Sequence, residues 1–574
     1  MDLKHLIPTV EKQNEEATEI ALHMNIYNTY IKWLKDNGCQ YPSLEFPVAF
    51  GPYGVIGARA LINIPSTKVH PKQGFLFVPS KIIISPQKAR NSEIGFIFDE
   101  HPRLFKTHSR AVDYILWFYI TYEFIKEEKS FYYPYFMAVG ESEMLMDWSE
   151  EELNELQDKF LIFESKKQEK MALYYYESLS RIFSQYTDFF PQCTLLGPFL
   201  WAYKLVTTRS FSHGEGLVIP LADNLNHEDV YVDYLTLSTG FLEKKAHDPL
   251  INNKDYKDFQ GIPNESSAPM RSRSHMNRLE KCLKIQNYAE PQFLRNIWEI
   301  EEFLGDYESS SDEEELVEDN EEDEENDEEN EDEEDDEDDE ECDEIEIDMA
   351  DKYFVMRTGN EGGFLKGQQV FNCYGRLNNT DLLGEYGFAL LPNRYDSVYV
   401  RMVKMTGANY TGEMPKIDFS QYKRLKDIVK VFYLKYYKIN EQFLEYFRKI
   451  ILKSPKEGFT IMGELKVITQ AEQVLLELMN CYKTTIEQDE IMLAEVPRIP
   501  IRKCFALRYR ISQKRIILSH LSMIETLKEI FWKVIEGQTM EAAHWKQKTI
   551  ANARVMYPLR KYLRDIRLNA FNNS

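Results

Sequence analysis

Apolar residues recur at helical spacing over long parts of the chain. Residues 15–37 show this pattern up to Gly38, which predicts a helix with a glycine stop. Residues 104–205 carry long helical patterns rich in aromatic side chains, and residues from about 419 to the end are almost entirely helical in pattern. These stretches predict a short N-terminal helix and two long helical regions, with non-helical segments between them.

Short apolar runs broken by glycine, proline and serine fill much of the remaining sequence. They occupy residues 46–83, and residues 216–245 and 352–373 have the same pattern. Runs of this length and punctuation are typical of small antiparallel sheets. Together with the helical patterns they predict an α+β protein.

The net charge of −27 comes from one segment. Between Asp312 and Asp348 there are 29 acidic residues and no Lys or Arg, so the rest of the chain holds 66 acids against 68 bases. A tract with so many like charges and so few apolar residues cannot offset its ordering entropy, which predicts disorder. Because β patterns flank it, we expect a disordered insertion over 247–351, in a loop that joins two β segments.

The seven cysteines are scattered, odd in number and without a CxxC pair. This argues against a disulfide framework and a structural zinc site, and we expect no metal. The apolar stretch from Tyr114 is interrupted by Glu123 and is too short to cross a bilayer, so it predicts a buried helix. We therefore expect a soluble cytoplasmic or nuclear protein without membrane partners.

Several separated motifs occur in one order along the chain. They are GPYGVIGARAL (51–61), FVPSKIIIS (77–85), SFYYPYF (130–136), TTRSF (207–211), PLADNLNH (220–227) and VFNCYGRLNNTDLLGEYGF (370–388). In this order they resemble the SET-domain methyltransferases of the Rubisco large-subunit methyltransferase type, including the actin-histidine methyltransferase branch. The resemblance covers nearly the whole chain except the 247–351 insertion.

The resemblance implies small β-sheets threaded so that the Asn-His and Tyr-Gly motifs meet in a pseudoknot-like crossing. It also implies S-adenosylmethionine as methyl donor. The domains expected are an N-terminal helical segment (1–45), a SET domain (46–400) with a helical insert (101–205), and a helical substrate-binding domain (401–574).

The resemblance places a cofactor site on residues of four motifs. Asn226 and His227 would hold the cofactor, since a zwitterion needs directional donors and acceptors. Arg209 would meet its carboxylate, and Asp223 would organise the site. Tyr53 and Gly54 would make a first contact with the adenine. The alternatives are a turn cap for Asn226, a buried histidine for His227, a turn-former for Asp223 and a surface ion pair for Arg209.

Tyr374 is the candidate catalytic residue. Methyl transfer from a sulfonium is an in-line displacement that needs a neutral amine and an aligned approach. A free lysine has a pKa near 10.4, so its neutral form costs about 4–5 kcal/mol at pH 7. A tyrosine hydroxyl in a desolvated aromatic site would orient the amine and reduce that cost. The alternative is a tyrosine that only packs in a sheet.

Phe211, Tyr386 and Phe388 are candidates for the walls of a substrate channel, because aromatic faces attract a methylated ammonium. An aromatic residue at 211 suits an aliphatic amine better than an imidazole and favours lysine. The sequence also departs from the family pattern, since Gly51 stands where an acid is frequent, and Asn224 and Asn372 stand where apolar residues are usual.

The function predicted is that of a protein-lysine N-methyltransferase, with a protein substrate, no direct nucleic-acid partner and a monomeric state. Two alternatives stay open: a histidine methyltransferase of the same fold, and a non-catalytic scaffold that binds basic proteins through the acidic insertion.

From Ile501 onward the chain has 15 basic and 5 acidic residues. One hypothesis is that the acidic insertion covers this basic segment, and another is that Ser309, Ser310 and Ser311 are phosphorylated.

Overall fold

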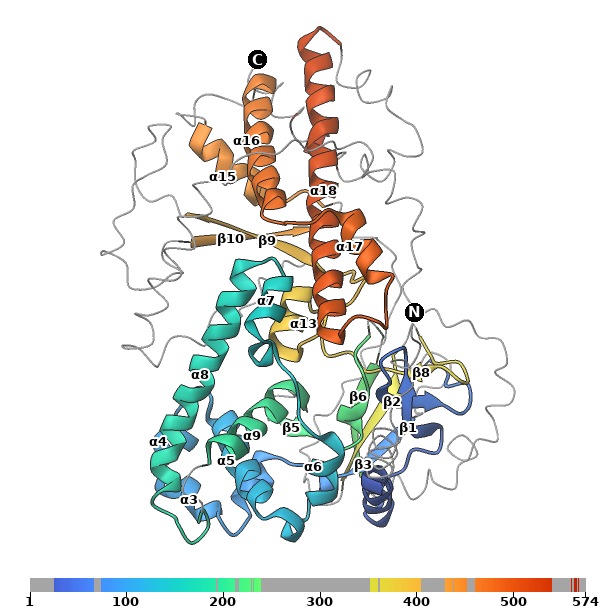
Figure 1. The fold of residues 1–574 in the computed structure, drawn as a ribbon, viewed down its shortest axis with the longest axis vertical. Helices are drawn as coiled ribbons and strands as arrows, with labels where there is room; N and C mark the ends of the chain where they lie inside the picture. The colour runs from blue at the N-terminus through green and yellow to red at the C-terminus, as the bar shows by residue number, and fades with distance from the viewer. Residues whose placement is uncertain are drawn as a thin grey trace, which may run out of the picture. The chain divides into compact units, whose positions relative to one another are not determined.

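A computed structural model of the chain (Figure 1) describes the residues outside several gaps. The described residues are 25–66, 74–191, 195–211, 216–228, 230, 232–238, 352–359, 362–403, 429–436, 438–451, 460–538, 559, 562–564 and 566. The whole 247–351 insertion, with the acidic tract and the three serines, lies outside them, and so do residues 1–24. The hypotheses on those segments therefore stay predictions.

The chain divides into two units, and the division falls between Cys373 and Tyr374. The first unit comprises Met1–Ser142, Tyr175–Ser267 and Ser311–Cys373, and the second Glu143–Tyr174, Ala268–Ser310 and Tyr374–Ser574. The first carries three of the small sheets, and the second carries the C-terminal helices and a two-stranded sheet.

The first described helix spans residues 25–36 and stops where the sequence predicts. Gly38 has φ +88°, a left-handed conformation that glycine adopts without steric cost, and its N–H donates to the carbonyl of Lys35 at 3.0 Å. Tyr30 and Leu34, one turn apart, are fully buried on the inner side. The predicted helix is thus confirmed for its described part.

One three-stranded antiparallel sheet comes from the glycine-rich runs that follow this helix. Its order is β1 (Leu44–Phe50), β2 (Val55–Ala60) and β8 (Gln369–Val370). β1 and β2 form a hairpin in which Phe50 pairs with Val55, and β8 pairs through Val370 with Ala58. β8 therefore brings a distant segment beside the N-terminal hairpin.

The second sheet has the order β3 (Leu76–Pro79), β7 (Lys352–Thr358), β6 (Val232–Ser238). β6 and β7 pair antiparallel over their whole length, from Val232 with Thr358 to Ser238 with Lys352. The chain between Ser238 and Lys352 thus leaves and returns at paired residues of one ladder. The strands on either side of the predicted insertion therefore pair with each other. A two-stranded ladder, β4 (Ser210–Phe211) with β5 (Leu217–Val218), completes the strands of this unit.

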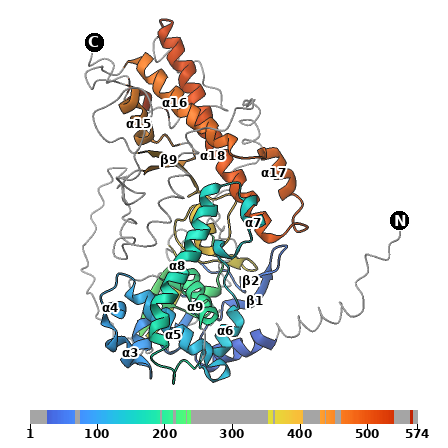
Figure 2. The same cartoon turned by 60° about the vertical axis from the view of Figure 1, so that its left-hand side comes forward.

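Helices fill the predicted 104–205 region (Figure 2). They and the short helices before them are α2 (Pro86–Arg90), α3 (Gly95–Glu100), α4 (Pro102–Phe105), α5 (Ala111–Ile125), α6 (Tyr133–Val139), α7 (Glu150–Glu155), α8 (Lys159–Phe183) and α9 (Leu196–Arg209). α5 packs against α9, and its residues from Tyr114 to Glu123 are buried within the protein. None of the described helices combines the length and apolar character needed to cross a membrane.

The C-terminal part of the second unit is mainly helical, as predicted. Its helices are α13 (Asn379–Tyr386), α15 (Glu441–Ile451), α16 (Ile461–Asn480), α17 (Ile486–Leu493) and α18 (Ile501–Ile535). α16 and α17 both pack on α18, and α16 runs beside it in Figures 1 and 2. The core between them is built from aliphatic side chains such as Ile468, Leu475 and Ile517.

The helix predicted through VKVFYLK is wrong. These residues form the strand β10 (Val429–Lys435), which pairs antiparallel with β9 (Ser397–Val403) in a two-stranded sheet. Phe432 and Leu434 are buried while Tyr433 between them is exposed, the alternation of a half-buried strand. The β-branched Val431 suits that pleated surface.

The basic residues of α18 are largely paired within the second unit. Ion pairs to acidic side chains are made by Arg502, Lys503, Arg510, Lys514, Arg515, Lys528 and Lys533. Arg508 donates to the carbonyl of Ala389 at 3.3 Å. Most basic residues of α18 therefore have acidic partners within their own unit, which weakens the hypothesis that the acidic insertion covers this helix.

Candidate functional site

The two motifs that open and close the predicted site meet in the first unit. His227 forms a parallel bridge with Asn372, although 145 residues separate them in the sequence. The N–H of Asn372 donates to the carbonyl of Asn226 at 2.9 Å, and the N–H of Glu228 donates to the carbonyl of Asn372 at 3.1 Å. PLADNLNH and FNCYG are thus held together by main-chain hydrogen bonds at the crossing that the sequence predicts.

The side chain of Asn226 reaches back to the N-terminal hairpin. Its Nδ2 donates to the carbonyl of Ile56 at 3.0 Å, which ties the crossing to β2. Gly57, the next residue, makes this approach possible: a Cβ there would lie 2.8 Å from Asn226 Nδ2 and 2.8 Å from Gln369 Nε2. The Asn226 amide is therefore oriented by a main-chain carbonyl of β2.

Arg209 and Asp223 form a charged pair close to the crossing. Arg209 is the last residue of α9. It donates through Nη1 to the main-chain carbonyl of Asp223 at 2.8 Å and through Nε to Ser142 Oγ at 3.2 Å. Its Nη1 lies 3.8 Å from Asp223 Oδ2. Tyr135 donates its hydroxyl to the same oxygen at 2.5 Å. Arg209 is thus held at several points, unlike an ordinary surface ion pair.

One carboxylate oxygen of Asp223 takes no part in these contacts. Asp223 Oδ1 is buried and has no hydrogen-bond partner of good geometry among the described residues. Burial raises the pKa of Asp223 to about 6, and the Arg209 guanidinium limits that rise. A buried acceptor without a partner is costly, so an oxygen of this kind marks a place where a donor is expected to bind.

His227 is buried, and desolvation lowers its pKa to about 4. The imidazole is therefore neutral at physiological pH and does not add a positive charge beside Arg209.

The backbone before Asp223 is strained. Leu221 has φ +73° and ψ −41° and is fully buried, a conformation that L residues with a branched side chain rarely adopt. It precedes the 3-10 turn Ala222–Asn224, in which the N–H of Asp223 donates to the carbonyl of Ile219 at 3.1 Å. Strain of this kind persists where the surrounding structure fixes it, and it is enriched at functional sites.

Tyr53 and Gly54 lie in the turn between β1 and β2. Gly51 and Gly54 both have left-handed backbone, with φ +64° and +66°, and neither would meet a heavy atom within 4 Å if it carried a Cβ. The glycines are thus required by conformation at this turn, and the space beside them is open. Tyr53 is partly buried there, and the family acid that Gly51 replaces would stand on the exposed turn.

The predicted channel residues fall into two groups. Phe211 in β4 packs edge-on against Phe354 of β7, with ring centroids 5.5 Å apart, in the first unit. In the second unit Tyr374 lies 5.0 Å from Tyr386 and 6.4 Å from Phe388, and Phe388 lies 6.3 Å from Phe505 of α18. Tyr374 therefore belongs to an aromatic cluster that includes both other predicted channel residues of its unit.

Sequence reasoning missed several residues that support the site. Tyr135, Ser142, Ile56 and Gly57 had no assigned role, yet each contacts a predicted cofactor residue. Three of them stood in motifs already noted: Tyr135 in SFYYPYF, and Ile56 and Gly57 in GPYGVIGARAL. The order of the motifs could have pointed to these residues. Their contacts with the predicted cofactor residues, however, can be seen only in the folded structure.

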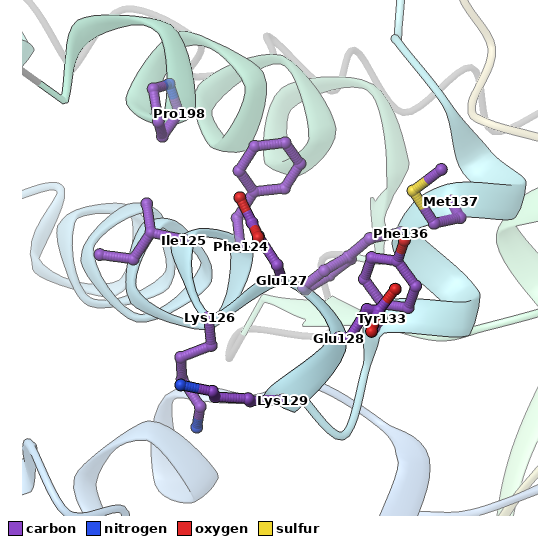
Figure 3. A pocket seen from close by; sticks show the side chains of 10 residues that line it. All are labelled: Phe124, Ile125, Lys126, Glu127, Glu128, Lys129, Tyr133, Phe136, Met137 and Pro198. Carbon is purple, nitrogen blue, oxygen red and sulfur yellow. The ribbon is translucent and has the colours of Figure 1, made fainter. Parts of the chain in front are cut away.

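A surface pocket of about 490 Å³ lies elsewhere in the first unit (Figure 3). It is lined by Phe124, Ile125, Lys126, Glu127, Glu128, Lys129, Tyr133, Phe136, Met137 and Pro198. None of the predicted site residues lines it, and Lys126 at its edge is paired with Glu123 at 2.7 Å. The pocket is therefore separate from the candidate site.

Known proteins share this architecture. A family model for the Rubisco LSMT substrate-binding domain matches residues 419–517. The crystal structure of the SET domain of LSMT bound to lysine and AdoHcy superposes with a TM-score of 0.52 at 17% identity, covering 89% of this chain and 93% of that one. A structure of Rubisco LSMT bound to sinefungin and monomethyllysine gives 0.52 at 16% identity, covering 89% and 92%.

The chain has the SET-domain fold of these Rubisco LSMT structures. Among curated proteins it is similar to the chloroplastic Rubisco large subunit N-methyltransferase of Pisum sativum, with 29% identity over 35% of this chain. It is also similar to the chloroplastic fructose-bisphosphate aldolase-lysine N-methyltransferase of Arabidopsis thaliana, with 28% identity over 39% of this chain. These matches span 38% and 43% of the length of the relatives.

The sequence prediction of the SET fold and of a helical C-terminal domain is thus confirmed. The domain boundaries and the roles of the individual site residues stay predictions for this SET-domain protein. So does any relation to the actin-histidine branch.

Proposed function

We propose that this SET-domain protein is an S-adenosylmethionine-dependent protein-lysine N-methyltransferase. The observation that carries the proposal is the bridge between His227 and Asn372. It joins the predicted cofactor motif to the segment that reaches Tyr374 two residues later. The similar aldolase-lysine N-methyltransferase and the LSMT structure bound to lysine support lysine as the acceptor.

The charges near the crossing fit a zwitterionic amino-acid group. Arg209 offers a guanidinium to a carboxylate. Asp223 Oδ1 offers a buried acceptor that has no hydrogen-bond partner of good geometry within the described part of the chain. Asn226 adds an amide oriented by Ile56. Gly51 leaves the turn without the acid that is frequent in the family. Asp223, an acid beside Arg209, would receive the ammonium of the cofactor instead. When bound, S-adenosylmethionine would supply the methyl group.

The remaining chemistry belongs to side chains of this chain. The lysine must reach the methyl group as a neutral amine, which an apolar aromatic environment favours over the ammonium. Tyr386 and Phe388 beside Tyr374 provide such surfaces. The Tyr374 hydroxyl would then accept or donate one hydrogen bond to orient the amine, and its ring would help to exclude water.

Transfer of a labelled methyl group tests the proposed function. The purified protein is incubated with radiolabelled S-adenosylmethionine and an extract, and the labelled residues are mapped by mass spectrometry. Label on lysine, made by the unaltered protein only, is expected. Label on histidine would select the histidine alternative. Absence of transfer together with absence of cofactor binding would select the non-catalytic scaffold.

Gly57→Ala is expected to weaken S-adenosylmethionine binding about three- to tenfold. The new Cβ would lie within contact distance of Asn226 Nδ2 and would displace the amide from its bond to Ile56, a change of the size of one hydrogen bond. Calorimetric titration measures it. Gly197→Ala is the matched control, because no atom lies within 4 Å of a Cβ there. Equal affinities for the two variants would contradict the role of Asn226.

Cofactor affinity is expected to fall as the pH is lowered from 7 to 5, with a midpoint near 6. Asp223 has a pKa of about 6, so its carboxylate is the acceptor of an ammonium group only above that pH. The neutral acid is preferred in the folded state, so Asp223 lowers stability as pH rises from about 4 to about 6. Asp223→Asn should bind weakly at both pH values. A pH profile that is the same in Asp223→Asn would exclude this carboxylate as the titrating group.

A further inference from the structure

A second buried carboxylate, outside the predicted site residues, lies in the second unit. Asp396 is fully buried, just before β9. Its Oδ1 accepts from the main-chain N–H of Asn379 at 3.0 Å and from that of Ser397 at 3.0 Å. Its Oδ2 accepts from Asn379 Nδ2 at 2.8 Å. A buried carboxylate with this many donors holds its neighbours in one arrangement.

Asn379 is the first residue of α13, the helix that ends at Tyr386. Its N–H is one of the free donors at the helix start, so the carboxylate of Asp396 caps it and also lies at the positive end of the helix dipole. The neighbouring Asn378 caps the same turn, accepting from the N–H of Thr380 at 2.8 Å. The start of α13 is thus fixed by two polar side chains.

The Asn379 amide also holds the chain that leaves α13. Its Oδ1 accepts from the N–H of Leu390 at 2.9 Å, and its Nδ2 donates to the carbonyl of Leu390 at 3.0 Å. At the other end Gly387, with φ +71°, closes the helix, and its N–H donates to the carbonyl of Leu383 at 3.0 Å. Phe388 therefore lies on a short segment tied at both ends.

Gln513 connects α18 to this arrangement. Its Nε2 donates to the carbonyl of Ser397 at 3.0 Å and lies 3.4 Å from Asp396 Oδ1. Gln513 is itself buried, with 3% of its surface exposed, and it lies within residues 419–517, which match the substrate-binding family. One side chain of the substrate-binding helices thus contacts the group that anchors α13.

We propose that Asn379, Asp396 and Gln513 are positioning residues that set the orientation of Tyr386 and Phe388. Through this network α18 supports the aromatic cluster. The position of α13, which carries Tyr386, is therefore fixed relative to α18. The link to methyl transfer rests on the proposed function. The structural link itself does not.

Fluorine NMR tests the network without a substrate. Tyr386 is replaced by 3-fluorotyrosine, and the spectrum is compared with and without Gln513→Met, which keeps the side-chain length but removes the donor. A shifted or second fluorine resonance is expected. The control is Gln473→Met, whose glutamine makes an exposed contact with Glu477 on α16, and it should leave the resonance unchanged.

Asp396→Asn serves as a second variant, because it keeps the shape of the residue and removes the acceptor of Asn379 Nδ2. It should change the same resonance even if Gln513→Met does not fold. S-adenosylmethionine affinity, measured in parallel, should stay within about twofold of that of the parent in both variants, while the rate of methyl transfer falls. An unchanged resonance in both folded variants would overturn the network. Absence of cofactor binding in the parent would overturn the proposed function alone.

Discussion

Tyr374→Phe is expected to lower methyl transfer by about 10²- to 10³-fold while S-adenosylmethionine affinity stays within about twofold. The variant loses one hydroxyl and keeps a ring that packs 5.0 Å from Tyr386. Losing one oriented polar group that acts in the transition state typically costs this much. Rates with a labelled cofactor and a substrate found with the unaltered protein provide the measurement.

A lower methyl-transfer rate at unchanged S-adenosylmethionine affinity distinguishes a catalytic tyrosine from a tyrosine that only packs against its neighbours. Tyr433→Phe is the matched control, since Tyr433 also packs against a tyrosine, Tyr399, at 4.8 Å, and is half exposed outside the cluster. Its rate should match that of the parent. If Tyr374→Phe transferred methyl groups at the parental rate, Tyr374 would be a packing residue and the assignment of catalysis to it would be wrong.

Asp489→Ala is expected to destabilise the C-terminal helices by about 3–5 kcal/mol. Asp489 lies 2.7 Å from Arg510 Nη2 and 2.6 Å from Lys514 Nζ, and all three residues are essentially fully buried. Removing the carboxylate would leave two buried positive charges without this partner, which is the costly case for a buried ion pair. Burial already lowers the pKa of Lys514.

Hydrogen exchange of peptides from α17 and α18 measures this loss locally, which avoids assuming that the two units unfold together. The control is Glu445→Ala, which breaks an exposed pair with Lys449 at 2.9 Å on α15 and should cost less than about 1 kcal/mol. Similar losses of stability in the two variants would show that the buried Asp489 ion pairs contribute no more than an exposed pair.

Much of the first unit could be predicted because local pattern and fold agree there. Gly38 ends a helix by a conformation that glycine favours, and the short β runs become the ladders of two sheets. The order of motifs predicted the meeting of Asn226–His227 with FNCYG. It did so through a resemblance, since no local pattern specifies a main-chain bridge across 145 residues.

The second unit shows where sequence reasoning stops. The VKVFYLK strand lies among amphipathic helical repeats. Its buried Phe432 and Leu434 flank the exposed Tyr433, a period of two that the surrounding helical period hides in the sequence. The surplus of positive charge after Ile501 suggested an open basic face, but partners such as Glu472 and Asp489 precede α18 in the sequence. Which charges pair depends on tertiary contacts, and composition does not contain them.

Calorimetric titration of S-adenosylmethionine into the full chain and into Asn226→Ala tests the central claim most directly. Asn440→Ala is the control, because Asn440 Nδ2 makes a similar bond to a strand carbonyl, that of Tyr433 at 3.1 Å, away from the crossing. The account predicts saturable one-to-one binding to the full chain and to Asn440→Ala, and binding at least about tenfold weaker to Asn226→Ala. Absence of binding to the full chain, or equal affinity in all three proteins, would contradict it.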